Sequence, residues 1–161
     1  MISGITPFTE EFKDNVIKLI LPIQREEFGI NITQEDQPDL MNIPNFYQQG
    51  KGNFWLARDN NQVVGTVSLK DIGNDNVALR KMFVHSDYRG KEKGVSQKLM
   101  DTAVRWAQEQ KVLHIYLGTT PEFLAAHRFY EKNGFAEIGR EELPEGFPVM
   151  DVDKKFYRLA L

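Results

Sequence analysis

Residues 82–95, with the sequence MFVHSDYRGKEKGV, join an apolar strand to a long helix through a basic loop that contains two glycines. Residues 77–84 are predicted to form a buried strand, and residues 93–110 carry apolar side chains at helical spacing. The N-terminus of a helix exposes backbone N–H groups that bind anions, and glycines let a ligand approach the backbone closely. The junction therefore predicts a diphosphate site, while an ordinary turn with solvated basic side chains is the alternative interpretation.

The rest of the chain alternates strand and helix signals, and no internal repeat is found. The other predicted strands are 2–8, 54–58, 63–72, 112–117, 135–138 and 156–161, and the other predicted helices are 10–28, 39–49 and 121–132. Pro22 is expected to kink the first helix or to end its regular part. This order predicts one α/β domain over residues 1–161, an α+β mixture with a central mixed sheet of about seven strands flanked by about four helices.

Length and composition restrict the classes of function. The 161 residues favour one domain, and the absence of cysteine excludes disulfide frameworks, thiolate zinc sites and cysteine nucleophiles. A net charge of −3 disfavours a nucleic-acid partner, and no apolar stretch approaches the roughly 20 residues that span a bilayer. No signal peptide is recognised, and the three histidines lack metal-ligand spacing. We therefore expect a cytoplasmic protein with no metal, no nucleic-acid partner and no membrane partner.

Two segments resemble the GCN5-related N-acetyltransferase (GNAT) family. Residues 84–95 are similar to its acetyl-CoA loop, Arg/Gln-x-x-Gly-x-Gly/Ala, with Glu92 where the family usually has its middle glycine. Residues 126–135, AHRFYEKNGF, are similar to its Ala-x-x-Phe-Tyr-Glu-Lys-x-Gly-Phe helix, with Phe123 where the family often has asparagine. The resemblance in element order covers nearly the whole chain and implies the GNAT fold.

Acetyl-CoA is the cosubstrate that this resemblance implies. It also implies that strands 77–84 and 112–117 diverge at a bulge, and that the pantetheine arm lies in the gap and pairs with the backbone. The implied cofactor contacts are Met82, Phe83, Val84, Arg89, Gly90, Lys91, Glu92, Lys93, Gly94, Val95, Ser96 and Tyr130. The Glu92 carboxylate would repel the pyrophosphate if it faced the ligand and would have little effect if it pointed to solvent.

Three residues are candidates for catalysis. The tyrosine that matches Tyr130 approaches the CoA sulfur in many family members, which implies a hydrogen bond to the departing thiolate. A thiol has a reference pKa near 8.5 and a phenol near 10, so full proton transfer from Tyr130 would be uphill. His127 lies three positions before Tyr130, and Glu27 closes the first helix, so both are candidates for handling the proton of the amine. Packed aromatic rings and an exposed glutamate are the alternative interpretations.

The predicted activity is acetyl-CoA-dependent N-acetylation of a primary amine by direct attack in a ternary complex. The acceptor is expected to be a small-molecule or peptide amine; the acidic first third of the chain would suit a cationic amine, and a solvated surface explains it equally well. A non-catalytic acyl-CoA-binding or regulatory module is the alternative, with Glu92 and Phe123 as marks of lost chemistry. The irregular loop 143–150 is expected either to cover the acceptor site or to help form a homodimer.

Overall fold

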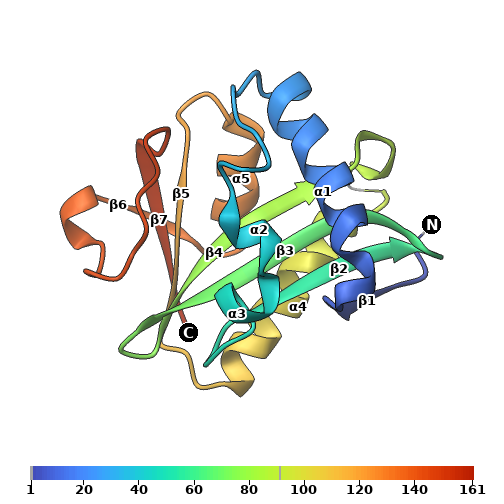
Figure 1. The fold of residues 1–161 in the computed structure, drawn as a ribbon. Coiled ribbons are helices and arrows are strands. Elements are labelled where there is room, and N and C mark those ends of the chain that lie inside the picture. The colour runs from blue at the N-terminus through green and yellow to red at the C-terminus, as the bar shows by residue number, and fades with distance from the viewer. Residues whose placement is uncertain (1, 91) are drawn as a thin grey trace.

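One mixed seven-stranded sheet forms the centre of the computed structural model, which describes residues 2–90 and 92–161 (Figure 1). In spatial order the strands are β1 (Gly4–Pro7), β2 (Asn53–Asp59), β3 (Gln62–Gly73), β4 (Asn76–Val84), β5 (His114–Thr119), β7 (Lys155–Ala160) and β6 (Ala136–Ile138). Neighbouring strands are antiparallel, except that β4 and β5 are parallel. The seven strands and the mixed α/β class confirm the prediction.

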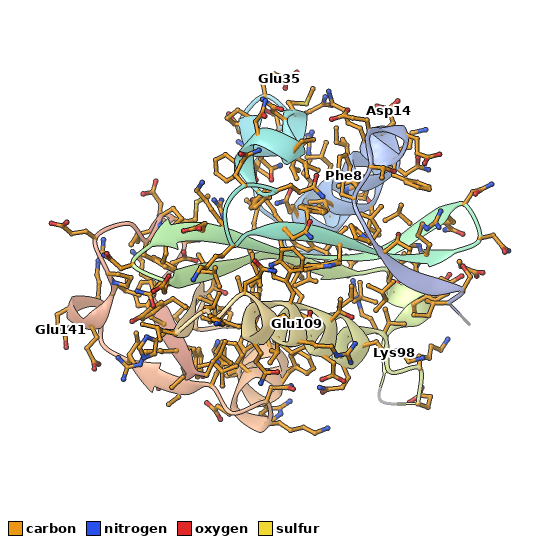
Figure 2. The ribbon with its side chains drawn as sticks, turned by 90° about the horizontal axis from the view of Figure 1, so that it is seen from below. Phe8, Asp14, Glu35, Lys98, Glu109 and Glu141 are labelled. Atoms are coloured by element: carbon orange, nitrogen blue, oxygen red, sulfur yellow. The ribbon has the colours of Figure 1, made fainter. Side chains whose placement is uncertain are left out.

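Helices cover both faces of the sheet (Figures 1 and 2). The helices are α1 (Lys13–Pro22), α2 (Pro38–Met41) and α3 (Ile43–Phe46) on one face, and α4 (Val95–Glu109) on the other. The fifth helix, α5 (Leu124–Lys132), follows β5, and just beyond it Asn133 Oδ1 accepts a hydrogen bond of 2.7 Å from the Gln97 side chain of α4. The end of α5 is therefore fixed against the start of α4.

An apolar core fills each side of the sheet because the central strands bury both of their faces. Val67 and Leu69 of β3 pack beneath α4 with Leu99, and Leu56 of β2 packs beneath α1 with Ile20. All five side chains are fully buried. Strands that are buried on both faces read as nearly continuous apolar runs, which is why β2 to β4 were recognisable from the sequence.

The helical boundaries differ from the prediction at three places. The expected helix 39–49 is broken at Asn42 into α2 and α3, because Pro44 fits only the first turn of a new helix. The expected helix 10–28 keeps its α-helical geometry only over residues 13–22, and after Pro22 a π-helical turn covers residues 23–27. The expected helix 121–132 begins at Leu124. The described residues therefore contain five α-helices, of which α2 and α3 are single turns.

Candidate active site

The strands β4 and β5 diverge into a wedge. They pair only where residues 76–78 lie opposite residues 114–116, and both strands continue beyond these pairs (Figure 1). The register between β3 and β4 shifts nearby, because two residues of β4 lie opposite one residue of β3. At this bulge Lys81 has a φ of +53°, in the left-handed region that side chains rarely adopt. The expected divergence of the two strands is thus present, with the bulge on β4.

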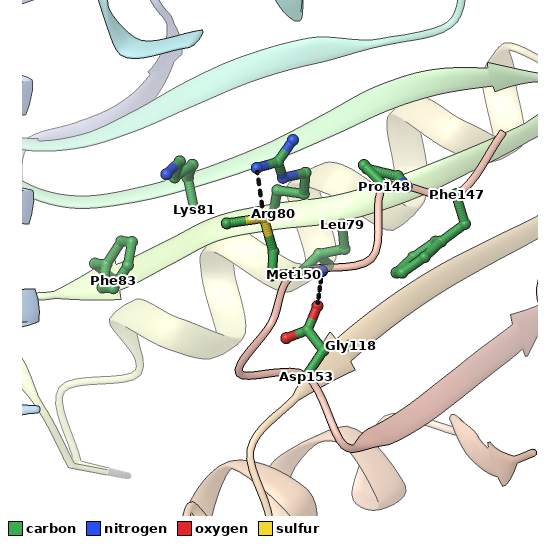
Figure 3. A pocket seen from close by; sticks show the side chains of 9 residues that line it. All are labelled: Leu79, Arg80, Lys81, Phe83, Gly118, Phe147, Pro148, Met150 and Asp153. Atoms are coloured by element: carbon green, nitrogen blue, oxygen red, sulfur yellow. Dashed lines mark hydrogen bonds between the residues drawn. The ribbon is translucent and has the colours of Figure 1, made fainter. Parts of the chain in front are cut away.

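The bulge places two consecutive basic side chains on one face of the sheet. Arg80 and Lys81 lie on the same side of β4 (Figure 3), although consecutive side chains of a regular strand alternate between faces. Hydroxyls of β3 hold this backbone: Thr66 Oγ1 donates to the Lys81 carbonyl at 2.7 Å, and Ser68 Oγ donates to the Arg80 carbonyl at 2.6 Å. The two cations are therefore positioned by the sheet rather than by a mobile loop.

Lys81 is held in a buried polar network beneath α2. Its ammonium donates to Gln37 Oε1 at 2.6 Å and lies 3.6 Å from Asp39 Oδ2. Tyr47 donates to the same carboxylate oxygen at 2.5 Å, and burial raises the pKa of this tyrosine. Burial also lowers the pKa of Lys81, while Asp39 acts in the opposite direction. Lys81 is thus a fixed and poorly hydrated amine.

A cavity of about 180 Å³ opens in the wedge beside these cations. The segment 143–154 between β6 and β7, called the strap below, closes one side of it (Figure 3). The lining residues are Leu79, Arg80, Lys81 and Phe83 of β4, Gly118 of β5, and Phe147, Pro148, Met150 and Asp153 of the strap. The cavity is smaller than the roughly 300–1,000 Å³ of pockets for drug-sized ligands, so it suits a small molecule.

Asp153 is a buried carboxylate on the strap side of the cavity. Its Oδ2 accepts a hydrogen bond of 3.2 Å from the backbone N–H of Met150. Gly118 makes room for it, since a Cβ at that position would lie 2.6 Å from Oδ2. Burial raises the pKa of Asp153, and the Met150 N–H and the charge of Arg80 oppose that increase. The cavity therefore combines a carboxylate of raised pKa with two cations.

Tyr130 of α5 is partly buried and packs against the core cluster that includes the buried face of α4. Its ring centroid lies 5.9 Å from that of Phe135 and 5.9 Å from that of Tyr157, so its orientation is fixed by aromatic packing. Burial, and to a lesser extent the charge of Asp153, raises the pKa of Tyr130 to about 12. Within the described residues, no hydrogen-bond partner of its hydroxyl is found. The hydroxyl is a protonated donor available to a ligand.

The loop before α4 has the backbone geometry of an anion site. Gly90 and Gly94 have φ values of +111° and +65°. The backbone N–H of Lys98 donates to the Gly94 carbonyl at 3.0 Å, which closes the first turn of α4. The backbone N–H groups of Val95, Ser96 and Gln97 therefore have no acceptor inside the helix. These groups and the helix dipole favour a negatively charged ligand.

Among the described residues of this loop, the charged side chains of Arg89, Glu92 and Lys93 contact other groups of the protein. Arg89 Nε donates to the Val84 carbonyl at 2.8 Å, and Arg89 Nη1 lies 2.6 Å from Oε1 of Glu27. Lys93 donates to the Asp87 carbonyl at 2.5 Å. The Glu92 carboxylate lies close to Gly90, two residues before it in the chain. A Cβ on Gly90 would be only 2.8 Å from Oε1 of Glu92. In the part of the loop that the structure describes, backbone N–H groups, more than side chains, are thus the available anion donors.

The other predicted site residues lie in different parts of the protein. Phe83 lines the cavity, while Met82 and Val84 pack into the core beneath α4. His127 is buried, its Nε2 lies 2.8 Å from the Thr120 carbonyl, and it does not line the cavity. Lys91 lies outside the described residues.

Several residues that line the cavity were not predicted from the sequence: the Arg80–Lys81 pair, Gly118 and Asp153. The pair had a signal in the sequence, since two adjacent charges interrupt an apolar strand. For Gly118 and Asp153 no local pattern stands out, because their proximity depends on how the strap folds over β5.

Comparison with known proteins identifies the family. The model of the Acetyltransferase (GNAT) family matches residues 17–135. The chain belongs to the GNAT acetyltransferase family. A GNAT acetyltransferase structure from Staphylococcus aureus Mu50 is 40% identical, has a TM-score of 0.92 and covers 99% of both chains. The resemblance to GNAT enzymes found in the sequence is thereby confirmed.

Two further GNAT relatives carry more specific names. The N-acetylaspartate synthetase of Danio rerio is 37% identical over 106 residues, which are 65% of this chain and 37% of that protein. This chain therefore matches little more than a third of that relative's length. The PaiA N-acetyltransferase of Thermoplasma acidophilum, solved in complex with coenzyme A, covers 100% of this chain and 99% of its own, with a TM-score of 0.77 and 15% identity. At that identity the likeness shows the GNAT fold alone.

Membrane-spanning helices and metal-binding clusters are both absent from the described residues, 2–90 and 92–161. No helix in these residues has the length and apolar character needed to cross a membrane. Nor do these residues bring three or more His, Asp or Glu side chains into an arrangement that could hold a metal ion.

Proposed function

We propose that this GNAT chain transfers the acetyl group of acetyl-CoA to the primary amine of a small amino acid, by direct attack in a ternary complex. The observation that carries the proposal is the cavity in the β4–β5 wedge, which places Arg80 and Lys81 near a carboxylate, Asp153. A free amino acid carries both an ammonium and a carboxylate, so it matches a cavity that has both charges. The family membership supports the acetyl-transfer chemistry.

The fit of acetyl-CoA rests on two features of the backbone. The divergence of β4 from β5 leaves residues 79–84 of β4 without a strand partner on that side, within the described residues. An extended pantetheine arm would pair with residues 82–84 of this edge as an added strand, which leaves the part of the cavity beside residues 79–81 to the acceptor. The pyrophosphate would lie at the N-terminus of α4, where Val95, Ser96 and Gln97 present their N–H groups. With the cofactor bound in this way, the thioester would lie near the cavity, and Tyr130 is the proposed hydrogen-bond donor to its sulfur.

The acceptor carboxylate is assigned to Arg80 and Lys81. Arg80 has a guanidinium, which binds carboxylates through two parallel hydrogen bonds, while the Lys81 ammonium, which already pairs with Asp39, would add positive charge nearby. The names of relatives such as N-acetylaspartate synthetase support an acidic amino acid as the acceptor. The cavity volume of about 180 Å³ also favours a free amino acid over the lysine of a folded protein.

The chemistry requires few groups. The neutral amine attacks the thioester carbonyl, a C–N bond forms, and the C–S bond breaks to release the CoA thiolate. Tyr130 would donate a hydrogen bond to the developing thiolate, because its raised pKa keeps the hydroxyl protonated. Such an interaction accelerates the reaction because it strengthens in the transition state.

An acceptor panel tests the proposal. The protein is incubated with acetyl-CoA and, separately, L-aspartate, L-glutamate, glycine or putrescine, and released thiol is measured while the acetylated product is identified by mass. Amino acids should be acetylated and putrescine should not. If acetyl-CoA binds by calorimetry and no amine in the panel is acetylated, the non-catalytic acyl-CoA-binding alternative replaces the proposal.

Arg80→Gln provides the matched test of carboxylate recognition, with Arg105→Gln on the exposed surface of α4 as its control. A hydrogen bond to a charged group contributes about 1.5–3 kcal/mol, so Arg80→Gln should lower kcat/KM for the best amino acid by roughly 10- to 150-fold. Arg105→Gln should behave as wild type. Equal kcat/KM values for the two variants would contradict the assignment of Arg80.

A further inference from the structure

We infer that Asp153 is the general base that removes a proton from the ammonium of the acceptor; this inference rests on the proposed acetyl transfer. An amine attacks a thioester only when it is neutral, and free amino acids are mostly protonated at their amino group near pH 7. Among the described residues that line the cavity, Asp153 is the one carboxylate. The two candidates from the sequence are engaged elsewhere, since Glu27 pairs with Arg89 and His127 contacts the Thr120 carbonyl.

The geometry leaves one oxygen of Asp153 available to a ligand. Oδ2 accepts the Met150 N–H at 3.2 Å, and Figure 3 shows the second oxygen directed away from that bond. The backbone of Gly118 packs against the same carboxylate, so the side chain is held from two sides. A base that is fixed in this way needs little reorganisation when an ammonium enters the cavity.

The electrostatic surroundings suit a base that works near neutral pH. The charged and titratable groups around it are Arg80 and Lys81 of β4, Tyr130 of α5, and the exposed strap residues Asp151 and Lys154. Burial raises the pKa of Asp153, and Arg80 limits the increase. A higher pKa makes the carboxylate a stronger base than an ordinary aspartate.

The proton balance is complete without any further reactant. The ammonium gives one proton to Asp153, the neutral amine forms the C–N bond, and a tetrahedral intermediate with a positively charged nitrogen results. When the C–S bond breaks, the second nitrogen proton is lost and the thiolate takes up one proton, with the Tyr130 hydroxyl as its hydrogen-bond donor. Asp153 then releases its proton to solvent. The products are the N-acetylated amino acid, CoA thiol and one proton.

Asp153→Asn is the decisive variant, and Asp151→Asn on the exposed part of the same strap is the matched control. The asparagine keeps the size of the side chain and still accepts the Met150 N–H. With L-aspartate, or whichever amine in the panel reacts best, Asp153→Asn should lower kcat at pH 7 by about 10²- to 10⁴-fold, the usual contribution of a general base. Acetyl-CoA affinity by calorimetry should be unchanged, and Asp151→Asn should match wild type in both assays.

The pH profile separates a base from a substrate-binding carboxylate. The kcat of the wild type should fall as the pH decreases through the raised pKa of Asp153, because the base becomes protonated, and Asp153→Asn should lack this acid limb. A raised KM with the acid limb of kcat retained would overturn the inference, as would an unchanged kcat. If Asp153→Asn does not fold, the wild-type profile decides, and a kcat that does not decrease as the pH is lowered toward the ordinary pKa of aspartate rejects the base.

Thermal unfolding gives a readout that does not depend on activity. The folded state binds more protons than the unfolded state between the ordinary pKa of aspartate and the raised one, so wild-type stability should decrease as the pH rises through that window. Asp153→Asn should lose this dependence and be the more stable protein at pH 7. An Asp153→Asn variant that is less stable than wild type at pH 7 would contradict the argument that the buried charge of Asp153 lowers the stability of the folded protein.

The outcomes distinguish this inference from the proposed function. Wild-type protein that releases no thiol with any amine overturns the proposed function itself, whereas an active Asp153→Asn variant overturns only this inference.

Discussion

Removal of the Tyr130 hydroxyl tests how the leaving thiolate is stabilised. Tyr130→Phe keeps the ring and its contacts with Phe135 and Tyr157, both at 5.9 Å between centroids, and deletes only the donor. Because no hydrogen-bond partner of this hydroxyl is found within the described residues, the deletion should leave no buried group unsatisfied. We expect the melting temperature of Tyr130→Phe to stay close to that of wild type.

The expected loss of rate follows from the pKa of Tyr130. At about 12, it lies about 3.5 pK units above the thiol reference of 8.5, so complete transfer of the phenolic proton to the thiolate would cost about 5 kcal/mol. A hydrogen bond to the developing charge avoids that cost. Deletion of one such donor typically lowers kcat by about 10²- to 10³-fold, which is the expected effect. The wild-type kcat should also show no basic limb near pH 10, since the hydroxyl stays protonated there.

The assay is a single-turnover measurement, in which product release does not mask the chemical step. Tyr157→Phe is the matched control, because it removes a hydroxyl from the same aromatic cluster, one that donates to Glu131 at 2.7 Å. This control should lower the melting temperature and preserve the single-turnover rate. A Tyr130→Phe variant with the wild-type single-turnover rate would refute the assignment, and a loss confined to acetyl-CoA affinity would make the hydroxyl a binding contact.

Two substitutions test how the cavity is built. Gly118→Ala places a Cβ 2.6 Å from Oδ2 of Asp153 and should displace the carboxylate, so kcat should fall while acetyl-CoA affinity is retained; Gly4→Ala, which has open space around its Cβ, is the control. Normal kcat in Gly118→Ala would contradict this packing argument. Lys81→Met leaves Asp39 buried without its cation and should cost about 3–5 kcal/mol, a decrease of roughly 6–20 °C in melting temperature. The double variant Lys81→Met/Asp39→Asn should lose less stability than the sum of the single variants, by about 0.5–3 kcal/mol, and strict additivity would exclude the coupling.

Local patterns in the sequence determine most of the fold. The helix α4 was predicted to within two residues, because Val95, Leu99 and Ala103 repeat at helical spacing and are buried. The prediction of a single helix over 39–49 was wrong because Pro44 lacks a backbone N–H and lies in the first turn of a new helix, α3. A single proline, which lacks a backbone N–H, can thus break a segment whose other residues favour one continuous helix.

The functional site was less predictable because it depends on tertiary contacts. Arg80 and Lys81 would face opposite sides of a regular strand, and only the bulge, held by hydroxyls of β3, brings them together. An aspartate in an irregular segment looks like a solvated loop residue, and Asp153 is buried only because the strap folds over Gly118. The loop before α4 was identifiable from its glycines, but the sequence did not indicate that Arg89 pairs with Glu27.

The electrostatic coupling between Asp153 and Tyr130 links the proposed deprotonation of the acceptor to the stabilisation of the leaving thiolate. The negative charge of Asp153 contributes to the raised pKa of Tyr130, so the hydroxyl is a weak acid before the acceptor is deprotonated. In the proposed mechanism, Asp153 becomes neutral when it takes the ammonium proton, and this contribution to the pKa of Tyr130 then disappears. The hydroxyl therefore becomes a stronger hydrogen-bond donor at the stage when the thiolate develops. Two groups on separate elements, the strap and α5, thus act in sequence because one charge lies within reach of both steps.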